Sequence, residues 1–249
     1  MTHAIVTGGG SGIGLAIAVR LAALDMEVTI MGRDPARLDA ARARHPQLRM
    51  VVCDVTDRGG VRRAVAKAVE LSGAVDVAVN GAGFVRSAPF LKHSEADWQE
   101  IMATNLMGAV HVIQEVLPAM RERDFGRIVN VASTTSLKPY PYVSAYVTSK
   151  HALLGLTRAL ALELARSGIT VNAVCPGYTD TELLGGAIAT IKSKTGRSDA
   201  DARKILAAAN PQGRLVDPEE VAHAVAWLVS PDSHSITGQA IVVAGGEVM

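Results

Sequence analysis

Thr7-Gly8-Gly9-Gly10-Ser11-Gly12-Ile13-Gly14 is the stretch that decides the fold of this 249-residue chain. It follows a short apolar run, Ala4–Val6, and leads into a helical segment, Leu15–Leu24. Glycines here allow a tight turn and let backbone N–H groups approach a pyrophosphate at the helix N-terminus, where the helix dipole favours an anion. The stretch therefore predicts a dinucleotide-binding turn, and an ordinary structural turn is the alternative interpretation.

Short apolar runs alternate with longer segments of helical periodicity along the chain. Most runs are apolar throughout, as expected for strands that are covered on both faces. Between them, the spacing of Val61, Val65 and Val69 is typical of an amphipathic helix. The alternation predicts a single α/β domain, with about seven parallel strands in one doubly wound sheet and helices on both faces. The predicted strands are Ala4–Val6, Val28–Met31, Met50–Cys53, Val75–Val79, Ile128–Val131, Thr170–Val174 and Ala240–Val243.

The composition excludes several functional classes. Lys and Arg number 25 and Asp and Glu 24, so the net charge of +1 provides no long-range attraction to nucleic acid or to an anionic membrane. No apolar run approaches the roughly 18 residues of a membrane span, and the N-terminus lacks the pattern of a signal peptide. Cys53 and Cys175 follow strand-like runs, which predicts buried free thiols and a cytoplasmic protein. The seven histidines show no ligand spacing, so no metal is expected.

The tip of the second predicted strand bears on the choice of cofactor. An acid there would bind the adenosine ribose, whereas an arginine accommodates a 2′-phosphate. Asp34 precedes Pro35 and is therefore interpreted as a helix N-cap, with the proline at the first helical position. Arg33 is then the phosphate contact, and NADP(H) is favoured over NAD(H). Arg37 could assist, although a solvated surface arginine has the same pattern.

Two further strand ends carry candidate ligand contacts. Asp54 follows the third strand and could accept a hydrogen bond from the adenine amino group, cap the helix expected around Thr56–Leu71, or do both. Asn80-Gly81-Ala82-Gly83 ends the fourth strand, where small residues let the backbone lie against a ligand. An ordinary glycine-rich loop is the alternative for this second stretch.

A tyrosine and a lysine four residues apart form the candidate reaction centre. On a helix, Tyr146 and Lys150 lie one above the other on the same face. We expect the ammonium to stabilise the phenolate and so to lower the pKa of the Tyr146 hydroxyl below its usual value of about 10. Ser133 follows the run Ile128–Val131 and could hold a carbonyl oxygen against the tyrosine. Taken alone the pair is a weak indication, because a solvated lysine above a packed tyrosine has the same spacing.

These separated motifs, in this order, resemble the short-chain dehydrogenase/reductase family in its single-domain form, which has a Rossmann-type fold. The resemblance covers nearly the whole chain and implies a catalytic tetrad of Asn105, Ser133, Tyr146 and Lys150. Gly81 departs from the pattern, because the family usually reads Asn-Asn-Ala-Gly at this loop, and the departure bears on the rigidity of the loop. The cofactor contacts that follow are Gly8, Ser11, Gly12, Ile13, Gly14, Arg33, Asp54, Val55, Asn80, Ala82, Gly83, Tyr146, Lys150, Pro176, Gly177, Thr179 and Thr181.

Within the family the motifs look most like those of 3-oxoacyl and polyketide ketoreductases. The resemblance implies reduction of a ketone by NADPH, with Tyr146 as general acid, Ser133 on the carbonyl oxygen and Asn105 positioning Lys150 through a water. A 3-oxoacyl thioester on CoA or on a carrier protein is the expected substrate. Ser167 stands where ketoreductases that dock acyl carrier protein commonly have arginine, so a CoA thioester or a free ketone stays open.

Two alternatives to this function remain. One is an NAD-dependent secondary-alcohol dehydrogenase that acts on a cyclic alcohol, a sugar or a hydroxyacyl-CoA. The other, from a different class, is a catalytically silent nucleotide-binding regulator. An intact tetrad disfavours the second alternative.

The resemblance also implies a lid and an oligomer. Residues 181–212 are expected to close over the substrate, with Gly185-Gly186 as a hinge. A homotetramer is expected, formed by the long helices after Asn105 and Tyr146 and by the last strand. The cations of the lid favour an anionic substrate, with a solvated helical face as the alternative, and they are Lys192, Lys194, Arg197, Arg203 and Lys204.

Overall fold

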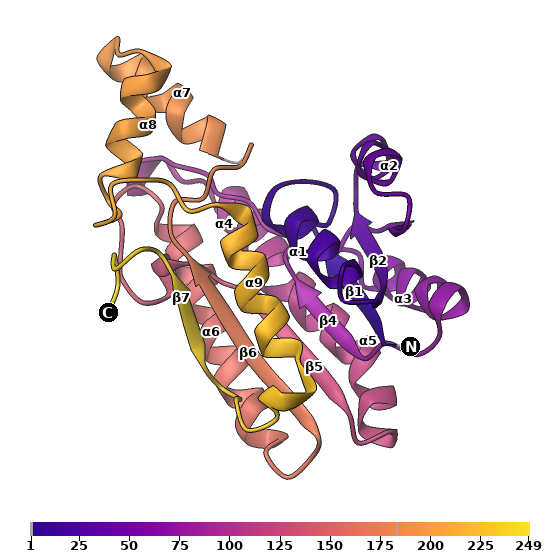
Figure 1. Ribbon diagram of the computed structural model, residues 1–249. Helices are drawn as coiled ribbons and strands as arrows, with labels where there is room; N and C mark the ends of the chain where they lie inside the picture. The colour runs from indigo at the N-terminus through magenta and orange to yellow at the C-terminus, as the bar shows by residue number, and fades with distance from the viewer. Residues whose placement is uncertain (1, 183) are drawn as a thin grey trace.

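The seven predicted strands are present and form one parallel sheet. The computed structural model describes residues 2–182 and 184–249. Within these residues the strand order is β3-β2-β1-β4-β5-β6-β7, and every neighbouring pair is parallel (Figure 1). The predicted fold class is therefore confirmed. The strands are β1 (His3–Thr7), β2 (Glu27–Gly32), β3 (Arg49–Val52), β4 (Val77–Asn80), β5 (Gly126–Val131), β6 (Ile169–Pro176) and β7 (Ala240–Val243).

Helices cover both faces of the sheet, as predicted. Ala4 and Val6 of β1 pack with α1 (Gly12–Ala22) and α9 (Pro218–Val229), which lie side by side in Figure 1. Ile5 between them packs with the helices of the opposite face. Successive strand residues point to opposite faces, so a strand between two helical layers must be apolar at every position. The remaining helices of the two layers are α2 (Pro35–Arg44), α3 (Arg58–Ser72), α4 (Glu95–Met102), α5 (Gly108–Glu122) and α6 (Ser144–Glu163).

Two helices stand apart from these layers, beyond the carboxyl end of β6 (Figure 1). They are α7 (Leu184–Thr195) and α8 (Asp199–Ala207), and they lie within the predicted lid, residues 181–212. Gly185 and Gly186 belong to the first turn of α7 rather than to a loop, and the hinge at this glycine pair stays a prediction. The pair of helices has a small core of its own, made of Leu184, Ile188, Ala202 and Leu206.

Two expectations from composition concern the thiols and the membrane. Cys53 and Cys175 are buried and unpaired, which confirms the prediction of free thiols. Among the helices that the structure describes, none combines the length and the apolar character needed to cross a bilayer.

Candidate active site

The turns that follow β1 and β4 meet at one point of the sheet edge. β1 and β4 are neighbours, but the chain continues from β1 towards β3 and from β4 towards β7, so their following segments diverge. In sheets of this kind a ligand binds outside the carboxyl ends of the strands at such a switch point. The Thr7 hydroxyl joins the two turns, because its oxygen accepts hydrogen bonds from the N–H of Gly81 at 3.1 Å and of Ala82 at 3.2 Å.

The glycine-rich turn has the shape that a dinucleotide phosphate requires. Gly8 has φ +69°, and a Cβ on it would lie 2.8 Å from the carbonyl oxygen of Gly81, so a side chain is excluded there. Ser11, at the N-cap of α1, makes no side-chain hydrogen bond to the first turn of the helix. The first N–H groups of α1 thus remain free of a side-chain cap, which suits an anion at this helix terminus. The residues present therefore fit a dinucleotide.

The tip of β2 is arranged as predicted. The Asp34 carboxylate accepts hydrogen bonds from the N–H of Ala36 at 2.9 Å and of Arg37 at 3.4 Å, with Pro35 at the first helical position of α2. Asp34 is therefore the helix cap, and its carboxylate is engaged. Arg33 is exposed beside it, and Arg37 reaches the Ser11 hydroxyl at 3.5 Å. Arg37 also pairs with Glu182 at 3.3 Å and with Asp34 at 3.6 Å, so the exposed Arg33 is the candidate for the phosphate contact.

Asp54 does not cap α3, which corrects one of its two predicted roles. Its carboxylate accepts from the N–H of Thr56 at 2.9 Å and from its hydroxyl at 2.8 Å, and Asp57 occupies the N-cap position. These hydrogen bonds, followed by the positive charge of Arg33, hold the pKa of Asp54 below its usual value. The exposed, ionised carboxylate can still accept from an adenine amino group. Val55 is buried against Gly108, so its side chain is engaged within the protein.

Tyr146 and Lys150 lie in the first two turns of α6, and both face the end of β5. The Lys150 ammonium lies 5.7 Å from the centre of the Tyr146 ring and donates to the carbonyl oxygen of Val131 at 2.8 Å. Lys150 is 5% exposed, whereas Tyr146 is half-buried. Ser133, two residues beyond Val131, lies close enough to Tyr146 to lower the pKa of its hydroxyl. Three of the four predicted catalytic residues therefore converge.

The pKa of Tyr146 moves in the opposite direction from the one expected. Burial raises the pKa of Tyr146 to about 12, and the hydrogen bond from Ser133 offsets this only in part. Burial likewise lowers the pKa of Lys150 to about 8. The expectation that the lysine charge would lower the pKa of Tyr146 is wrong, because burial is the largest cause of the shift and the Lys150 charge is not among its causes. The protein therefore presents the Tyr146 hydroxyl as a proton donor at neutral pH.

Asn105 joins this group from the other side. It lies in a π-helical segment, Ala103–Met107, between α4 and α5, and such segments often occur at functional sites. Its side chain is 2% exposed and exchanges two hydrogen bonds with the backbone of Phe84, each of 3.0 Å. It also donates to the Ser149 hydroxyl at 3.1 Å. A Cβ on Gly83 would lie 3.1 Å from the Asn105 oxygen and 3.5 Å from the Lys150 nitrogen, so a side chain there would press on Asn105.

The Asn80 side chain turns inward. Its amide donates to the Asn130 oxygen at 2.8 Å, and the Asn130 amide donates to the Thr157 hydroxyl at 2.8 Å. A buried chain of hydrogen bonds thus links β4, β5 and α6, and a ligand can meet Asn80 through its backbone only. At Gly81, a Cβ would lie 2.7 Å from the carbonyl oxygen of Thr7. The asparagine usual in the family does not fit this backbone, and the Thr7 hydroxyl holds the loop instead.

The segment after β6 crosses from the reaction centre to the dinucleotide turn. The Thr179 hydroxyl is buried and donates to the carbonyl oxygen of Gly177 at 3.0 Å, and Thr179 pairs with Val216 in an isolated bridge. The methyl group of Thr181 lies 3.2 Å from where a Cβ on Gly12 would be. Of the predicted contacts on this segment, Thr181 therefore lies next to the predicted turn, whereas Thr179 is buried.

The structure also places the remaining predicted contacts and shows two serines near the reaction centre that the sequence analysis did not identify. Ile13 and Ala82 are half-buried and pack on the two cores, and Pro176 ends β6. The sequence analysis did not identify Ser149 as a site residue, although its position between Tyr146 and Lys150 indicated that it lies in the site. Ser136 was also missed, and its hydroxyl donates to the carbonyl oxygen of Lys150 at 2.9 Å.

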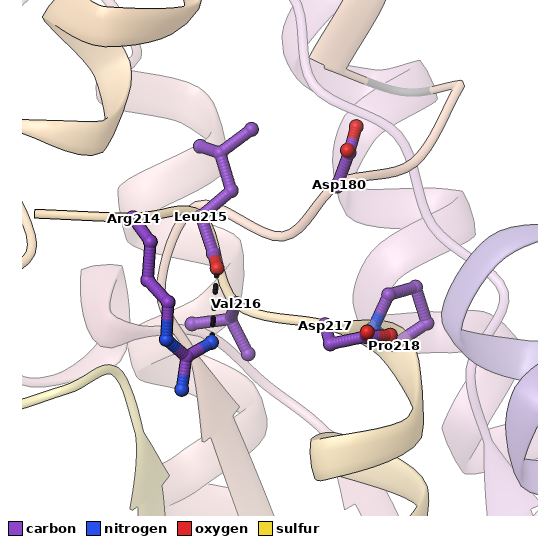
Figure 2. Close-up of a pocket in the computed structure, with 6 residues that line it drawn as sticks. All are labelled: Asp180, Arg214, Leu215, Val216, Asp217 and Pro218. Atoms are coloured by element: carbon purple, nitrogen blue, oxygen red, sulfur yellow. Dashed lines mark hydrogen bonds between the residues drawn. The ribbon is translucent and has the colours of Figure 1, made fainter.

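A shallow recess of about 460 Å³ lies at the base of α7 and α8, away from these residues. Figure 2 shows Asp180 on one side of it and the segment Arg214–Pro218 on the other. Arg214 donates to the carbonyl oxygen of its neighbour Leu215 at 3.2 Å and pairs with Glu220 at 2.6 Å. None of the predicted catalytic residues lines this recess, so the reaction centre is distinct from it.

Comparisons with known proteins agree with this arrangement. The model of the short chain dehydrogenase family matches residues 2–192. The structure of actinorhodin polyketide ketoreductase with NADPH superposes with a TM-score of 0.96 at 38% identity, covering 99% of this chain and 97% of that one. A ketoacyl reductase assigned to the granaticin polyketide synthase of Streptomyces violaceoruber is 39% identical, over 98% of this chain and 92% of the relative. Acetoacetyl-CoA reductase of Rhizobium meliloti is 36% identical, over 98% and 97%.

Proposed function

The chain belongs to the short-chain dehydrogenase/reductase family, and from this premise we propose that it is an NADPH-dependent ketoreductase acting on a 3-oxoacyl thioester or a related ketone. It is an oxidoreductase that interconverts ketones and secondary alcohols with a nicotinamide dinucleotide. The observation that carries the proposal is the convergence of Ser133, Tyr146 and Lys150 at the end of β5, beside the switch point. The relatives that reduce ketoacyl and acetoacetyl groups support the substrate class.

The proposed roles follow from the geometry of the side chains. Tyr146 donates its hydroxyl proton to the carbonyl oxygen as that oxygen becomes an alkoxide, which suits a phenol whose pKa is about 12. Ser133 holds the same oxygen by a hydrogen bond that strengthens as charge develops. Lys150, fixed on the carbonyl oxygen of Val131, stabilises the phenolate that remains. Asn105 fixes the backbone of Phe84 and the Ser149 hydroxyl, and so the position of α6. A bound nicotinamide dinucleotide would supply the hydride.

We propose NADP(H) over NAD(H) on the basis of Arg33. Arg33 is exposed at the tip of β2, and Asp34 is engaged as a helix cap rather than free to bind a ribose hydroxyl. The structurally similar actinorhodin polyketide ketoreductase was solved with NADPH, which supports this choice. Titration of both cofactors by fluorescence tests it: Arg33→Ala should weaken NADPH binding at least about tenfold and leave NADH binding unchanged. Equal weakening of both cofactors would contradict the assignment and favour the NAD-dependent dehydrogenase.

We also propose that residues 181–212 form the substrate lid. The segment leaves the reaction centre after β6, crosses the dinucleotide turn and carries its own core in α7 and α8. Two of its five cations are paired with carboxylates: Lys192 pairs with Asp199 at 3.2 Å, and Arg203 pairs with Asp180 at 2.7 Å. An anionic substrate is therefore less strongly favoured than the sequence suggested. Measuring kcat/KM for CoA-linked and truncated 3-oxoacyl substrates across a salt series tests it, since equal values without a salt effect would exclude recognition of the anion.

A homotetramer is the proposed assembly, and the cytoplasm the proposed location. The four residues of β7, at the edge of the sheet, are half-buried, and Leu162 near the end of α6 is 81% exposed. Apolar surface at these places suits contacts between copies of the chain. Light scattering at micromolar concentration checks the mass, and a monomer would contradict the proposal. The cytoplasmic location rests on the two free thiols.

A further inference from the structure

The turn that follows β3 carries the carboxylate that is expected to meet adenine. The N–H of Asp57 donates to the carbonyl oxygen of Asp54 at 3.2 Å, which closes a turn over the four residues Asp54-Val55-Thr56-Asp57. Asp54 and Thr56 are exposed, whereas Val55 is 6% exposed. The turn thus has an inner side that packs on the protein and an outer side from which a carboxylate can reach a ligand.

Helix α5 holds the inner side of this turn at two points. A Cβ on Gly108, the first residue of α5, would lie 2.6 Å from Cγ2 of Val55, so a side chain there would push the helix and the turn apart. About one helical turn further along, Nδ1 of His111 lies 2.9 Å from the carbonyl oxygen of Val55. A carbonyl oxygen only accepts hydrogen bonds, so Nδ1 carries the proton and is the donor.

One peptide unit connects His111 with Asp54. The carbonyl oxygen of Val55 and the N–H of Thr56 belong to the same peptide plane, and in a trans peptide they point in opposite directions. The N–H of Thr56 donates to the Asp54 carboxylate at 2.9 Å. The plane is therefore held by the imidazole at one end and by the carboxylate at the other. Donation to the oxygen of a peptide strengthens the hydrogen bond that its N–H makes.

Apolar packing does not explain a histidine at this position. Helix α5 packs on the sheet through Val112, Ile113 and Val116, which are at most 3% exposed. His111 is half-buried beside them and directs its Nδ1–H at the turn. A hydrogen bond constrains direction as well as distance. The imidazole thus gives the turn an orientation that the contact at Gly108 does not supply.

We propose that His111 is a positioning residue of the adenine site, which acts through the Val55–Thr56 peptide to hold the Asp54 carboxylate towards the amino group of the purine. The arrangement selects a 6-amino purine, because a carboxylate accepts a hydrogen bond from an amino group and repels the oxygen of a 6-oxo purine. A turn that α5 has already oriented loses less freedom when the dinucleotide binds. The inference rests on the proposed function in placing adenine beside Asp54.

Two cofactors that differ only at the purine test the proposal: NADPH and its deamino analogue, in which hypoxanthine replaces adenine. Fluorescence titration gives the Kd of each, and the parent protein should bind NADPH about tenfold more tightly than the analogue. In His111→Leu this preference should fall to about threefold or less through weaker binding of NADPH, with the Kd of the analogue within about twofold of the parent. An equal rise in both Kd values would make His111 merely structural and overturn the proposal, as would a parent protein without the preference.

A conservative variant and a matched control accompany this measurement. Asparagine has nearly the shape of leucine and places an N–H close to the position of Nδ1, so His111→Asn should retain most of the preference for NADPH. Gln114→Leu makes a comparable exchange at an exposed position of α5 and should leave both Kd values within about twofold of the parent. Equal losses of preference in His111→Asn and His111→Leu would contradict the role of the N–H.

A double-mutant cycle tests whether His111 acts through Asp54. Asp54→Asn removes the charged acceptor and should abolish most of the preference for NADPH. In that background, His111→Leu should change the Kd of NADPH by less than about twofold, because the carboxylate that it positions is gone. Losses that multiply in the double variant would show that the two residues act independently and would overturn the proposal.

Turnover is measured separately from binding, which keeps this inference distinct from the proposed function. A protein that binds neither cofactor would overturn both. A protein that reduces a 3-oxoacyl thioester with NADPH and yet binds the two cofactors equally would overturn the positioning role and leave the proposed function standing.

Discussion

Different interactions hold the proposed reaction centre and the proposed lid in place. Asn105, Ser149 and Lys150 are 2%, 0% and 5% exposed. Hydrogen bonds fix Lys150 to β5, Asn105 to the backbone of Phe84, and Ser149 to Asn105. In α7 and α8 the fixed part is a cluster of four apolar side chains, and the ion pairs around it have partners that are 43% to 58% exposed. Exposed ion pairs contribute little to stability. Directional hydrogen bonds thus fix the proposed catalytic side chains, whereas a small apolar cluster and exposed ion pairs hold the proposed lid.

The largest expected effect is the loss of turnover when the proposed proton donor of the reaction centre is removed. Tyr146→Phe removes the proposed proton donor, so kcat for ketone reduction should fall by about a thousandfold while NADPH binding is retained. Stopped-flow absorbance of NADPH oxidation measures the rate, and fluorescence titration measures the binding. The matched control is Tyr142→Phe, a tyrosine that is 61% exposed and outside the proposed machinery. Parent-like turnover in Tyr146→Phe would sink the assignment.

The next prediction compares the effect of a glycine-to-alanine substitution on the free energy of unfolding in the two regions. Gly81→Ala places a Cβ 2.7 Å from the carbonyl oxygen of Thr7, so the free energy of unfolding should fall by about 1–3 kcal/mol. Gly185→Ala in α7 meets no heavy atom within 4 Å and replaces glycine in a helix, so the same quantity should stay level or rise by up to about 1 kcal/mol. Urea denaturation followed by circular dichroism gives both values. Equal losses would mean that the lid is as tightly packed as the centre.

The pH dependence of kcat/KM tests whether the reaction centre needs a charged Lys150. Burial lowers the pKa of Lys150 to about 8, and the proposed mechanism uses its charged form. Activity is therefore complete below that pKa and is lost as pH rises through it, with kcat/KM falling about tenfold per pH unit on the alkaline limb. Lys150→Arg, if active, should move this limb to higher pH because guanidinium stays charged to about pH 12 or above. NMR titration of the Lys150 ammonium locates the pKa directly, and a flat profile through pH 10 would contradict the assignment.

The smallest effect is expected in the lid. Arg203→Ala removes its ion pairs with Asp180 and Asp199, whose nitrogen–oxygen distances are 2.7 Å and 3.5 Å. Since all three side chains are well exposed, the free energy of unfolding should change by less than about 0.5 kcal/mol. The urea assay used for the glycine variants applies here, with Lys67→Ala as a control on α3 for another exposed pair. A loss of several kcal/mol would show that the lid is anchored by charge after all.

Much of the molecule follows from patterns between near neighbours in the chain. The alternation of apolar runs with helical segments predicted the strands, and the turn from Gly8 to Gly14 predicted the place of the ligand site. Asp34 before Pro35 predicted a helix cap, which the structure confirms. Tyr146 and Lys150 share a helix face because their spacing is four. In each case the responsible interaction lies within one or two turns of chain, so the sequence itself determined it.

Other properties were decided by residues far apart in the sequence. The pKa of Tyr146 rises rather than falls because the whole fold removes its hydration, which spacing to Lys150 does not reveal. Asn80 turns inward because Asn130, on the next strand, receives it. Glu247 reaches Tyr140 across 107 residues because the chain returns to the same sheet edge. Burial and long-range contact exist only once the strands have assembled, so the tertiary structure alone could settle these features.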